Sequence, residues 1–308
     1  MPAEFKHSEK LMGNQFELTV VSDDAIAAQE QLHQAVAEIR RIEKLFTTFN
    51  DESQTNQVNA AAGSRPVKVD AEMLELLERC HRISAVTDGA FDISYGSLDK
   101  RLWNFDKSLE QLPSAEAARK MVQLINYQNV ILDKAAGTVF LKEKGMRIGF
   151  GGIGKGYAAD KAAAVLQGLG VHSGLVNASG DIKAWGTQAN GEAWTIGISH
   201  PDNPGNAFAY LNISNRAIAT SGNYEKFAII NGKKYSHTIN PKTGLPVTGI
   251  KSVTIVAPNA ELADAMATPV TIMGVKAGLN MINQIPQLGC IIIDESNKIF
   301  SSKNINLS

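Results

Sequence analysis

The chain has 308 residues, of which 44% are apolar and 20% are charged, and this composition is typical of a folded globular protein, which excludes a fibrous or disordered chain. The 30 basic and 31 acidic residues give a formal net charge of −1, so no overall field attracts nucleic acid or an anionic membrane. Composition therefore disfavours a nucleic-acid partner.

The two cysteines, Cys80 and Cys290, both lie in apolar segments, and we interpret them as core residues. Two cysteines are too few for a disulfide framework or a zinc site built on thiolates. The first residues lack the apolar region of a signal peptide, and no run approaches about 18 apolar residues. The sequence as given predicts neither export nor a membrane span, and it leaves the native localisation open.

In the first half of the chain, alternating polarity predicts strands and apolar residues at helical spacing predict helices. A polar stretch and a loop, recognised by their composition, separate these elements. The strands are expected at 15–21, 129–133 and 138–142, the helices at 25–46 and from 73 to the Asp88-Gly89 pair, the polar stretch at 47–65 and the loop at 90–105.

The second half of the chain begins with a glycine cluster and continues as a mixture of short strands and helices. Helices are expected at 155–169, 260–273 and 275–284, about seven short strands between 175 and 256, and a buried strand at 290–293. Helices and hairpins are interspersed without a strict alternation of strand and helix, so the chain is predicted to be α/β of the mixed α+β type.

The glycine-rich segment 149–156 satisfies two nucleotide-binding patterns, and each lacks a residue that its chemistry needs. A phosphate-binding P-loop requires Ser or Thr after Lys155 to hold magnesium, but Gly156 stands there. A dinucleotide fingerprint requires an acid at the end of the following strand, which ends in Asn177. The remaining interpretations are a close approach of the backbone to a ligand phosphate at a helix start, or simply a tight turn.

Eight short segments form a further pattern, in which each segment is weak alone but their order and spacing are specific. They are 11–13, 49–53, 87–93, 151–160, 177–182, 219–225, 235–244 and 263–268. Together they resemble the ApbE family, the FAD:protein FMN transferases, over most of the chain. The resemblance implies a single domain, 1–308, with two lobes, largely antiparallel sheets of T-fold-like architecture, and a site for FAD and Mg²⁺ between the lobes.

The resemblance also implies the reaction: Mg²⁺-dependent transfer of the FMN half of FAD to a Ser or Thr hydroxyl of an acceptor protein, with release of AMP. Such phosphoryl transfer needs a cation, a base near the attacking hydroxyl and in-line positioning. The implied partners are FAD and the acceptor protein. Members of the family are commonly periplasmic and anchored to the inner membrane, which a removed leader or lipid anchor would permit here, with a cytoplasmic location as the alternative.

Two residues at the start of the helix expected at 260–273 are candidates for the metal site. Asp264 and Thr268 are four positions apart, so both side-chain oxygens can face one point, and hard oxygen ligands suit Mg²⁺. The resemblance adds the backbone carbonyls of Gly152 and Ala267. The alternative interpretation of Asp264 is a helix cap.

The resemblance assigns the base and the nucleotide contacts to further residues. His237 would lie beside the reacting phosphate, where a neutral imidazole can accept a proton near pH 7, although a lone histidine is also common as a structural residue. Phe49 and Phe91 have ring faces suited to stacking, or they pack in the core. The nucleotide contacts implied are Met12, Phe49, Ala90, Phe91, Asp92, Gly149, Lys155, His237 and Ile239.

At three positions, Gly149, Asn223 and Asn240, the chain lacks a carboxylate that the family pattern carries. Asparagine keeps a hydrogen-bond acceptor and loses the charge, which suffices if those acids serve to form turns. Gly149 keeps no polar group, so a contact to the adenosine part of FAD is missing.

Three other functions stay open at this point. Water in place of the acceptor hydroxyl would give hydrolysis of FAD to FMN and AMP. Loss of catalysis would leave a silent FAD-binding protein, against which the presence of His237, Asp264 and Thr268 argues. An NAD-dependent oxidoreductase is disfavoured because the acid that would bind the ribose is absent.

Overall fold

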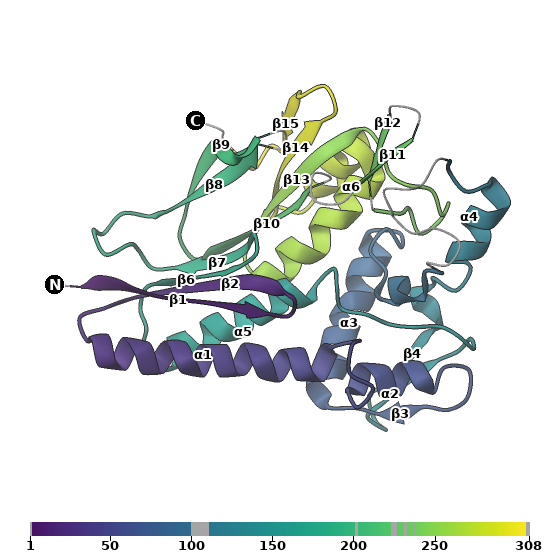
Figure 1. Ribbon diagram of the computed structural model, residues 1–308, viewed down its shortest axis with the longest axis horizontal. Coiled ribbons are helices and arrows are strands. Elements are labelled where there is room, and N and C mark those ends of the chain that lie inside the picture. Colours follow the sequence, from purple (N-terminus) through teal and green to yellow (C-terminus); the bar gives the residue numbers. More distant parts are fainter. Residues whose placement is uncertain are drawn as a thin grey trace.

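The computed structural model describes residues 2–99, 111–200, 203–222, 227–230, 233–236 and 238–305. Its largest unit is an eight-stranded sheet with the strand order β1-β2-β6-β7-β10-β13-β14-β15, in which every pair is antiparallel (Figure 1). These strands are β1 (Ala3–Leu11), β2 (Asn14–Ser22), β6 (Gly174–Ala178), β7 (Asp181–Trp185), β10 (Arg216–Gly222), β13 (Ile250–Ala257), β14 (Gly289–Asp294) and β15 (Ile299–Ser301).

Three helices pack on one face of this sheet: α1 (Ala25–Phe46), α5 (Gly154–Gly168) and α6 (Ala260–Ile282). In Figure 1 they run side by side, and α5 lies between the other two. The predicted helix 25–46 is confirmed at both ends. It begins where the Asp24 side chain accepts hydrogen bonds from two free backbone N–H groups, and its apolar stripe is buried.

The opposite face is covered by a two-stranded ribbon, β8 (Trp194–His200) and β9 (Asn203–Ile213). Trp194 and Ile213 at the base of this ribbon pack against Ile182 and Ile218 of the sheet in a second small core. The sheet is therefore buried on both faces near β7 and β10, where the chain also places its candidate site.

A smaller group of elements adjoins one end of the large sheet, at the lower right of Figure 1. It contains a three-stranded sheet with the order β3-β5-β4. Its elements are α2 (Gln54–Ala60), β3 (Val67–Lys68), α3 (Ala71–Val86), the 3₁₀ turns η1 (Ile93–Ser97) and η2 (Tyr127–Asn129), α4 (Ala115–Val122), β4 (Val130–Asp133) and β5 (Thr138–Leu141). A separate hairpin is formed by β11 (Phe227–Ile230) and β12 (Lys233–Ser236).

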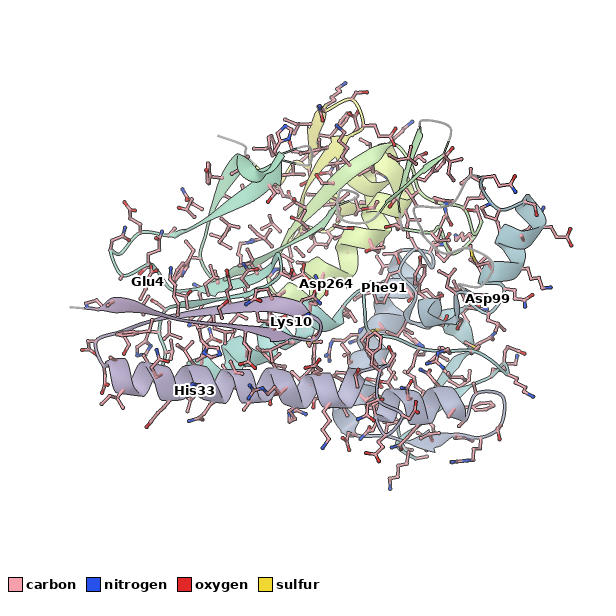
Figure 2. The ribbon with its side chains drawn as sticks, in the orientation of Figure 1. Glu4, Lys10, His33, Phe91, Asp99 and Asp264 are labelled. Atoms are coloured by element: carbon pink, nitrogen blue, oxygen red, sulfur yellow. The ribbon has the colours of Figure 1, made fainter. Side chains whose placement is uncertain are left out.

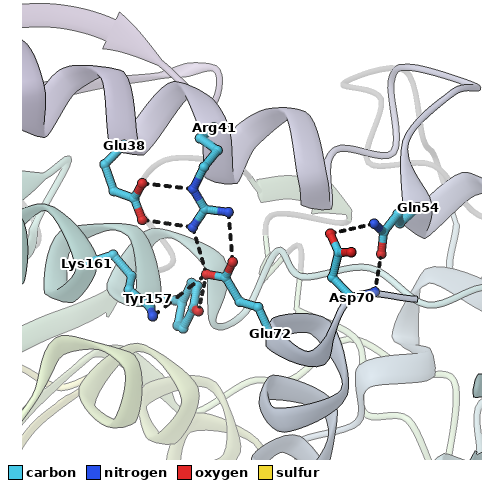
Figure 3. Close-up of polar contacts among 7 residues, drawn as sticks. All are labelled: Glu38, Arg41, Gln54, Asp70, Glu72, Tyr157 and Lys161. Atoms are coloured by element: carbon cyan, nitrogen blue, oxygen red, sulfur yellow. Dashed lines mark hydrogen bonds and ion pairs between the residues drawn. The ribbon is translucent and has the colours of Figure 1, made fainter. Parts of the chain in front are cut away.

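A polar network joins α1, α3 and α5 (Figure 3). The Arg41 guanidinium donates to Glu38 and, at 2.7 and 2.9 Å, to both oxygens of Glu72. The Tyr157 hydroxyl donates to Glu72 across 2.5 Å, and Lys161 lies 3.8 Å from the same carboxylate. The carboxylate of Glu72 on α3 thus links α5 to α1.

The structure differs from the sequence-based expectation in the polar stretch and agrees with it at two places in the second half of the chain. The polar stretch 47–65 contains α2. The described residues between 174 and 257 form eight strands, which agrees with the expectation of about seven. The helices expected at 260–273 and 275–284 both lie in α6, and the break between them is confirmed, because Gly274 has the non-helical φ of 82°. Among the described residues, no helix is long and apolar enough to cross a membrane.

Candidate active site

The candidate site lies where the first turn of α5 meets α6 and the start of β7, near the middle of the molecule in Figure 2. The Lys155 ammonium is 2.7 Å from Oδ2 of Asp181, and the backbone N–H of Gly156 donates to Oδ2 of Asp264 across 3.1 Å. Two neighbouring residues of α5 therefore reach two acids that are 83 positions apart in the chain.

Gly156 has a steric role at this junction. A Cβ atom at this position would lie 2.1 Å from the carbonyl oxygen of Ala260 and 2.8 Å from the Cβ of Asp264. No side chain fits there, because real Cβ atoms do not approach backbone oxygens so closely. The residue that argues against a P-loop in the sequence is therefore the one that lets α5 and α6 touch.

Asp264 does not cap α6. The free N–H groups at the start of the helix are satisfied by Asn259, whose side chain accepts from Leu262, and by Asp160, which accepts from Ala260 and Glu261 at 2.9 and 2.8 Å. Asp264 lies one turn further along and accepts from α5 instead. The capping interpretation of Asp264 is therefore wrong.

The charges at the junction are not balanced. Burial is the main cause that raises the pKa of the Asp264 carboxyl above its usual range, and the charge of Asp181 raises it further, while Lys155 and the Gly156 N–H oppose the rise. The side chains of Asp181 and Asp264 are almost entirely buried. Two carboxylates and one ammonium leave a formal charge of −1 among these three groups, which favours a bound cation.

The oxygens around Asp264 fit a hard cation. Thr268, one turn further along α6, is half-buried, and Gly152 lies in the partly exposed turn before α5. In the described part of the chain no three His, Cys, Asp or Glu side chains are grouped closely enough to hold a metal. Carboxylate, hydroxyl and backbone carbonyl oxygens, as on Asp264, Thr268 and Gly152, are the donor chemistry that Mg²⁺ prefers.

The loop before α5 is held on both sides. Asn59 of α2 accepts from the N–H of Ile148 at 2.7 Å and donates to its carbonyl at 3.1 Å, and the N–H of Gly149 donates to the carbonyl of Ile93. Gly149 does not have a positive φ, and an added Cβ would meet nothing closer than a Thr48 methyl group at 3.8 Å. The backbone at Gly149 therefore does not require glycine.

The two phenylalanines that were candidates for stacking lie in opposite environments. Phe49 is 99% exposed, so it does not pack in the core. Phe91 is buried in the main core, and its ring edge borders the turn before α5, 3.8 Å from where a Cβ of Gly152 would lie. Phe49 thus offers exposed ring faces, whereas Phe91 packs against the glycine turn. The contact of either ring with a flavin stays a prediction.

Of three further residues with implied nucleotide contacts, Met12 lies close to the same turn, and Asp92 and Ala90 lie in the loop before η1. Met12 is half-buried at the tip of the β1–β2 hairpin with φ 52°, and its Cε lies 3.6 Å from the Cβ position of Gly154. Asp92 accepts from the N–H and hydroxyl of Ser94 and from the N–H of Tyr127, while burial raises its pKa. Ala90 is buried. The Asp92 oxygens thus organise the loop itself.

The segment around the predicted base is anchored at its described residues. Ser236 and Thr238 are buried, and the Ser236 hydroxyl accepts from the N–H of Thr238 at 3.0 Å. The Ile239 side chain is fully buried, and its N–H donates to the Tyr95 hydroxyl. His237 lies outside the described residues, as does Asn223.

Asn240 forms the turn that an aspartate at this position would form. Its side-chain oxygen accepts from the N–H of Lys242 at 2.9 Å, and its carbonyl accepts from the N–H groups of Thr243 and Gly244. Gly244 has φ 71° and lies directly against the Ala118 carbonyl of α4. The amide therefore replaces the carboxylate at this position without loss of the turn.

The structure thus brings Lys155 and Asp264 to one junction and adds one residue that has no role in the sequence-based prediction, Asp181. Thr268 lies one turn beyond Asp264 on α6 and Gly152 lies in the turn before α5, so their part in a metal site stays a prediction. The signal for Asp181 was present in the segment 177–182, where an acid follows a Ser-Gly turn at the start of a strand. The turn is tight, because Ser179 and Gly180 have φ 55° and 100° and Gly180 donates to the Asn177 side chain. Because this turn precedes β7 directly, Asp181 lies at the junction of α5, α6 and β7.

The sequence model of the ApbE family matches residues 12–292. The chain is 31% identical over 300 residues to an FAD:protein FMN transferase of Klebsiella pneumoniae (strain 342), covering 97% of this chain and 92% of that protein. It is 30% identical to the FAD:protein FMN transferase of Treponema pallidum (strain Nichols), with 98% and 88% covered.

Two solved structures have the same fold. The ApbE protein of Thermotoga maritima superposes with a TM-score of 0.87 at 29% identity, covering 97% of both chains. The flavinyl transferase ApbE of Pseudomonas stutzeri, in its apo form, superposes with a TM-score of 0.86 at 26% identity, covering 98% of this chain and 96% of that one. The mixed α+β fold with antiparallel sheets is therefore confirmed.

Proposed function

The chain belongs to the ApbE family and is an FAD:protein FMN transferase, and we propose that it carries out this reaction at the junction of α5, α6 and β7. The observation that carries the proposal is the buried carboxylate of Asp264, held by the Gly156 N–H beside a second carboxylate and Lys155. This excess of negative charge suits a cation, and a cation is what phosphoryl transfer from FAD requires.

The metal is Mg²⁺, held by the carboxylate of Asp264, the hydroxyl of Thr268 and the backbone carbonyls of Gly152 and Ala267. Bound there, Mg²⁺ supplies charge neutralisation for the pyrophosphate of FAD. The protein's own contribution is to hold the carboxylate of Asp264 against α5, since the Gly156 N–H donates to Oδ2 of Asp264.

The pyrophosphate of FAD lies at the start of α5, beside the glycine turn and the Lys155 side chain, where the positive end of the helix dipole favours an anion. The flavin lies against Phe49, with Met12, Phe91 and the 90–92 segment beneath it. The remaining contacts that we propose are Gly149, which offers only backbone on the adenosine side, and Ile239 and His237 near the reacting phosphate. In this arrangement FAD and Mg²⁺ lie between two lobes of one T-fold-like domain.

In the transfer step, the acceptor's Ser or Thr oxygen attacks the phosphorus of the FMN half. A new phosphoester bond forms, the bond from that phosphorus to the bridging pyrophosphate oxygen breaks, and AMP leaves with that oxygen. His237 takes the proton of the attacking hydroxyl. Support for His237 comes from its position in the segment 235–244, whose neighbours Ser236 and Thr238 are buried and hydrogen-bonded to each other.

The experiment incubates the protein with FAD, Mg²⁺ and an acceptor protein, and it measures the flavin fluorescence of the acceptor band in a gel. The wild-type protein should label the acceptor, Asp264→Asn should not, and His237→Ala should lose about two to four orders of magnitude in rate while it still binds FAD. The exposed Glu143→Gln is the control and should behave as wild type. Full labelling by Asp264→Asn would remove this residue from the site.

A further inference from the structure

Asp181 is the buried acid at the junction to which the proposed reaction gives no role. It is the first residue of β7, and its side chain is 3% exposed. Burial of a carboxylate is costly unless a partner compensates it. One such partner is Lys155, whose ammonium lies 2.7 Å away and whose side chain is about one quarter exposed.

Lys155 has a second acid within its reach. Asp264 interacts with both Lys155 and Asp181, so the three charged groups form one cluster. An ammonium is attracted to whichever carboxylate is free, and an ion pair between Lys155 and Asp264 would place a positive charge where the metal binds. The observed pairing avoids this, because the Lys155 ammonium lies on Asp181.

We infer that Asp181 is a positioning residue that engages Lys155 and so leaves the carboxylate of Asp264 to the metal, an inference that rests on the proposed function. The formal charge supports it. Counting only these three described groups, Asp181, Lys155 and Asp264 together carry a formal charge of −1. Removal of the Asp181 charge makes this sum zero, and removal of both the Asp181 and the Lys155 charges makes it −1 again. A neutral cluster attracts a divalent cation less strongly.

This arithmetic predicts a rescue that a purely structural role would not give. Asp181→Asn should raise the dissociation constant for Mg²⁺ roughly 10- to 100-fold, the usual effect of removing a group that orients a metal ligand. Adding Lys155→Met to Asp181→Asn should restore the constant to within about threefold of wild type, because residues in one charged network are not additive. A structural role for Asp181 predicts that the double variant binds as weakly as the single one, or more weakly.

The experiment titrates Mg²⁺ into protein saturated with FAD and follows the flavin fluorescence, with thermal unfolding recorded alongside. Saturating FAD separates the metal effect from any contact of Lys155 with the nucleotide. Glu9→Gln, which removes an ion pair with Arg40 between β1 and α1, is the control for loss of an ion pair elsewhere and should leave the Mg²⁺ titration unchanged.

The variant Asp264→Asn distinguishes failure of the proposed metal site from failure of the inference about Asp181. If it leaves the Mg²⁺ titration unchanged, the proposed metal site is wrong and the inference falls with it. If Asp264→Asn abolishes the response while Asp181→Asn stays within about threefold of wild type, or if the double variant is not rescued, only the inference about Asp181 is overturned. Should Asp181→Asn fail to fold, Lys155→Met alone decides: Mg²⁺ binding at least as tight as wild type supports the inference, and weaker binding contradicts it.

Discussion

The backbone N–H of Gly156 donates to Oδ2 of Asp264 across 3.1 Å, at a place where a Cβ on Gly156 would lie only 2.8 Å from the Cβ of Asp264. One contact thus joins the first turn of α5 to the second turn of α6. Because the residues before Gly156 face the proposed pyrophosphate position and Asp264 is the proposed metal ligand, this contact fixes the two halves of the site relative to each other.

Replacement of Gly156 by alanine is expected to separate these helices. The added methyl group meets the Ala260 carbonyl at 2.1 Å, so Gly156→Ala should lower the free energy of unfolding by about 1 to 3 kcal/mol and weaken Mg²⁺ binding. The matched control is Gly168→Ala at the other end of α5, where a Cβ meets nothing within 4 Å. It should leave stability unchanged or raise it by up to about 1 kcal/mol. Urea denaturation of both variants measures the difference, and equal stability would mean that α5 and α6 do not touch there.

Restoring an acid at Gly149 should tighten FAD binding. Gly149→Asp supplies a charged hydrogen-bond partner worth about 1.5 to 3 kcal/mol, which corresponds to tenfold or more in affinity. The backbone conformation and the 3.8 Å clearance at Gly149 predict no loss of stability. Calorimetry with FAD and a melting temperature check both points, and Gly149→Ala controls for the added Cβ. Weaker binding at unchanged stability would mean that this chain holds its nucleotide differently from its relatives.

Because the ring of Phe49 is exposed, its removal is expected to weaken FAD binding without changing the stability of the fold. Phe49→Ala should raise the dissociation constant of FAD about threefold to tenfold through loss of ring stacking, while the unfolding curve stays unchanged because the side chain is 99% exposed. Phe49→Tyr keeps the ring and should bind FAD as the wild type does. An unchanged FAD constant in Phe49→Ala would place the flavin elsewhere.

The network of Figure 3 predicts a pH-dependent stability. Hydrogen bonds from Arg41 are the main cause that lowers the pKa of Glu72 below its ordinary value of 4.5, and the Tyr157 hydroxyl adds to this effect. A carboxyl with a lowered pKa in the folded state stabilises the protein fully above the unfolded value and loses that contribution as the pH falls through the folded value.

Glu72→Gln should therefore cost about 1 to 3 kcal/mol at neutral pH, and its difference from wild type should shrink as the pH falls below about 4. Chemical denaturation at a series of pH values follows this difference. Glu75→Gln, on the exposed side of α3, should show no such dependence. A difference that stays constant down to low pH would assign the effect to packing and not to charge.

The sequence predicts an element correctly where its buried apolar residues recur at a single regular spacing. The helix 25–46 has a continuous apolar stripe and an Asp24 cap, and both ends agree with the structure. The short helix α2 was missed because its buried residues include Thr55, Asn56 and Asn59, which satisfy backbone groups of neighbouring loops and leave no apolar period. Local patterns do not report such tertiary hydrogen bonds.

The part of the candidate site that could be predicted is the part that a sequence motif or a spacing along one helix defines. Asp264 and Thr268 follow from their spacing on one helix, but the contact between Gly156 and Asp264 and the pairing of Lys155 with Asp181 join segments far apart in the chain. No local pattern contains that information. The alternative that Asp264 is a cap failed for the same reason, since the cap is supplied in part by Asp160 from a different helix.

The most direct test of the account counts two products in one reaction: AMP released and FMN bound to the acceptor protein, by chromatography and by intact-protein mass spectrometry, with Mg²⁺ present or chelated. We expect one AMP for each FMN attached, with both products absent after chelation and in Asp264→Asn. Release of AMP without attached FMN would make the protein a hydrolase of FAD, and attachment that persists after chelation would contradict a metal-dependent transfer at Asp264.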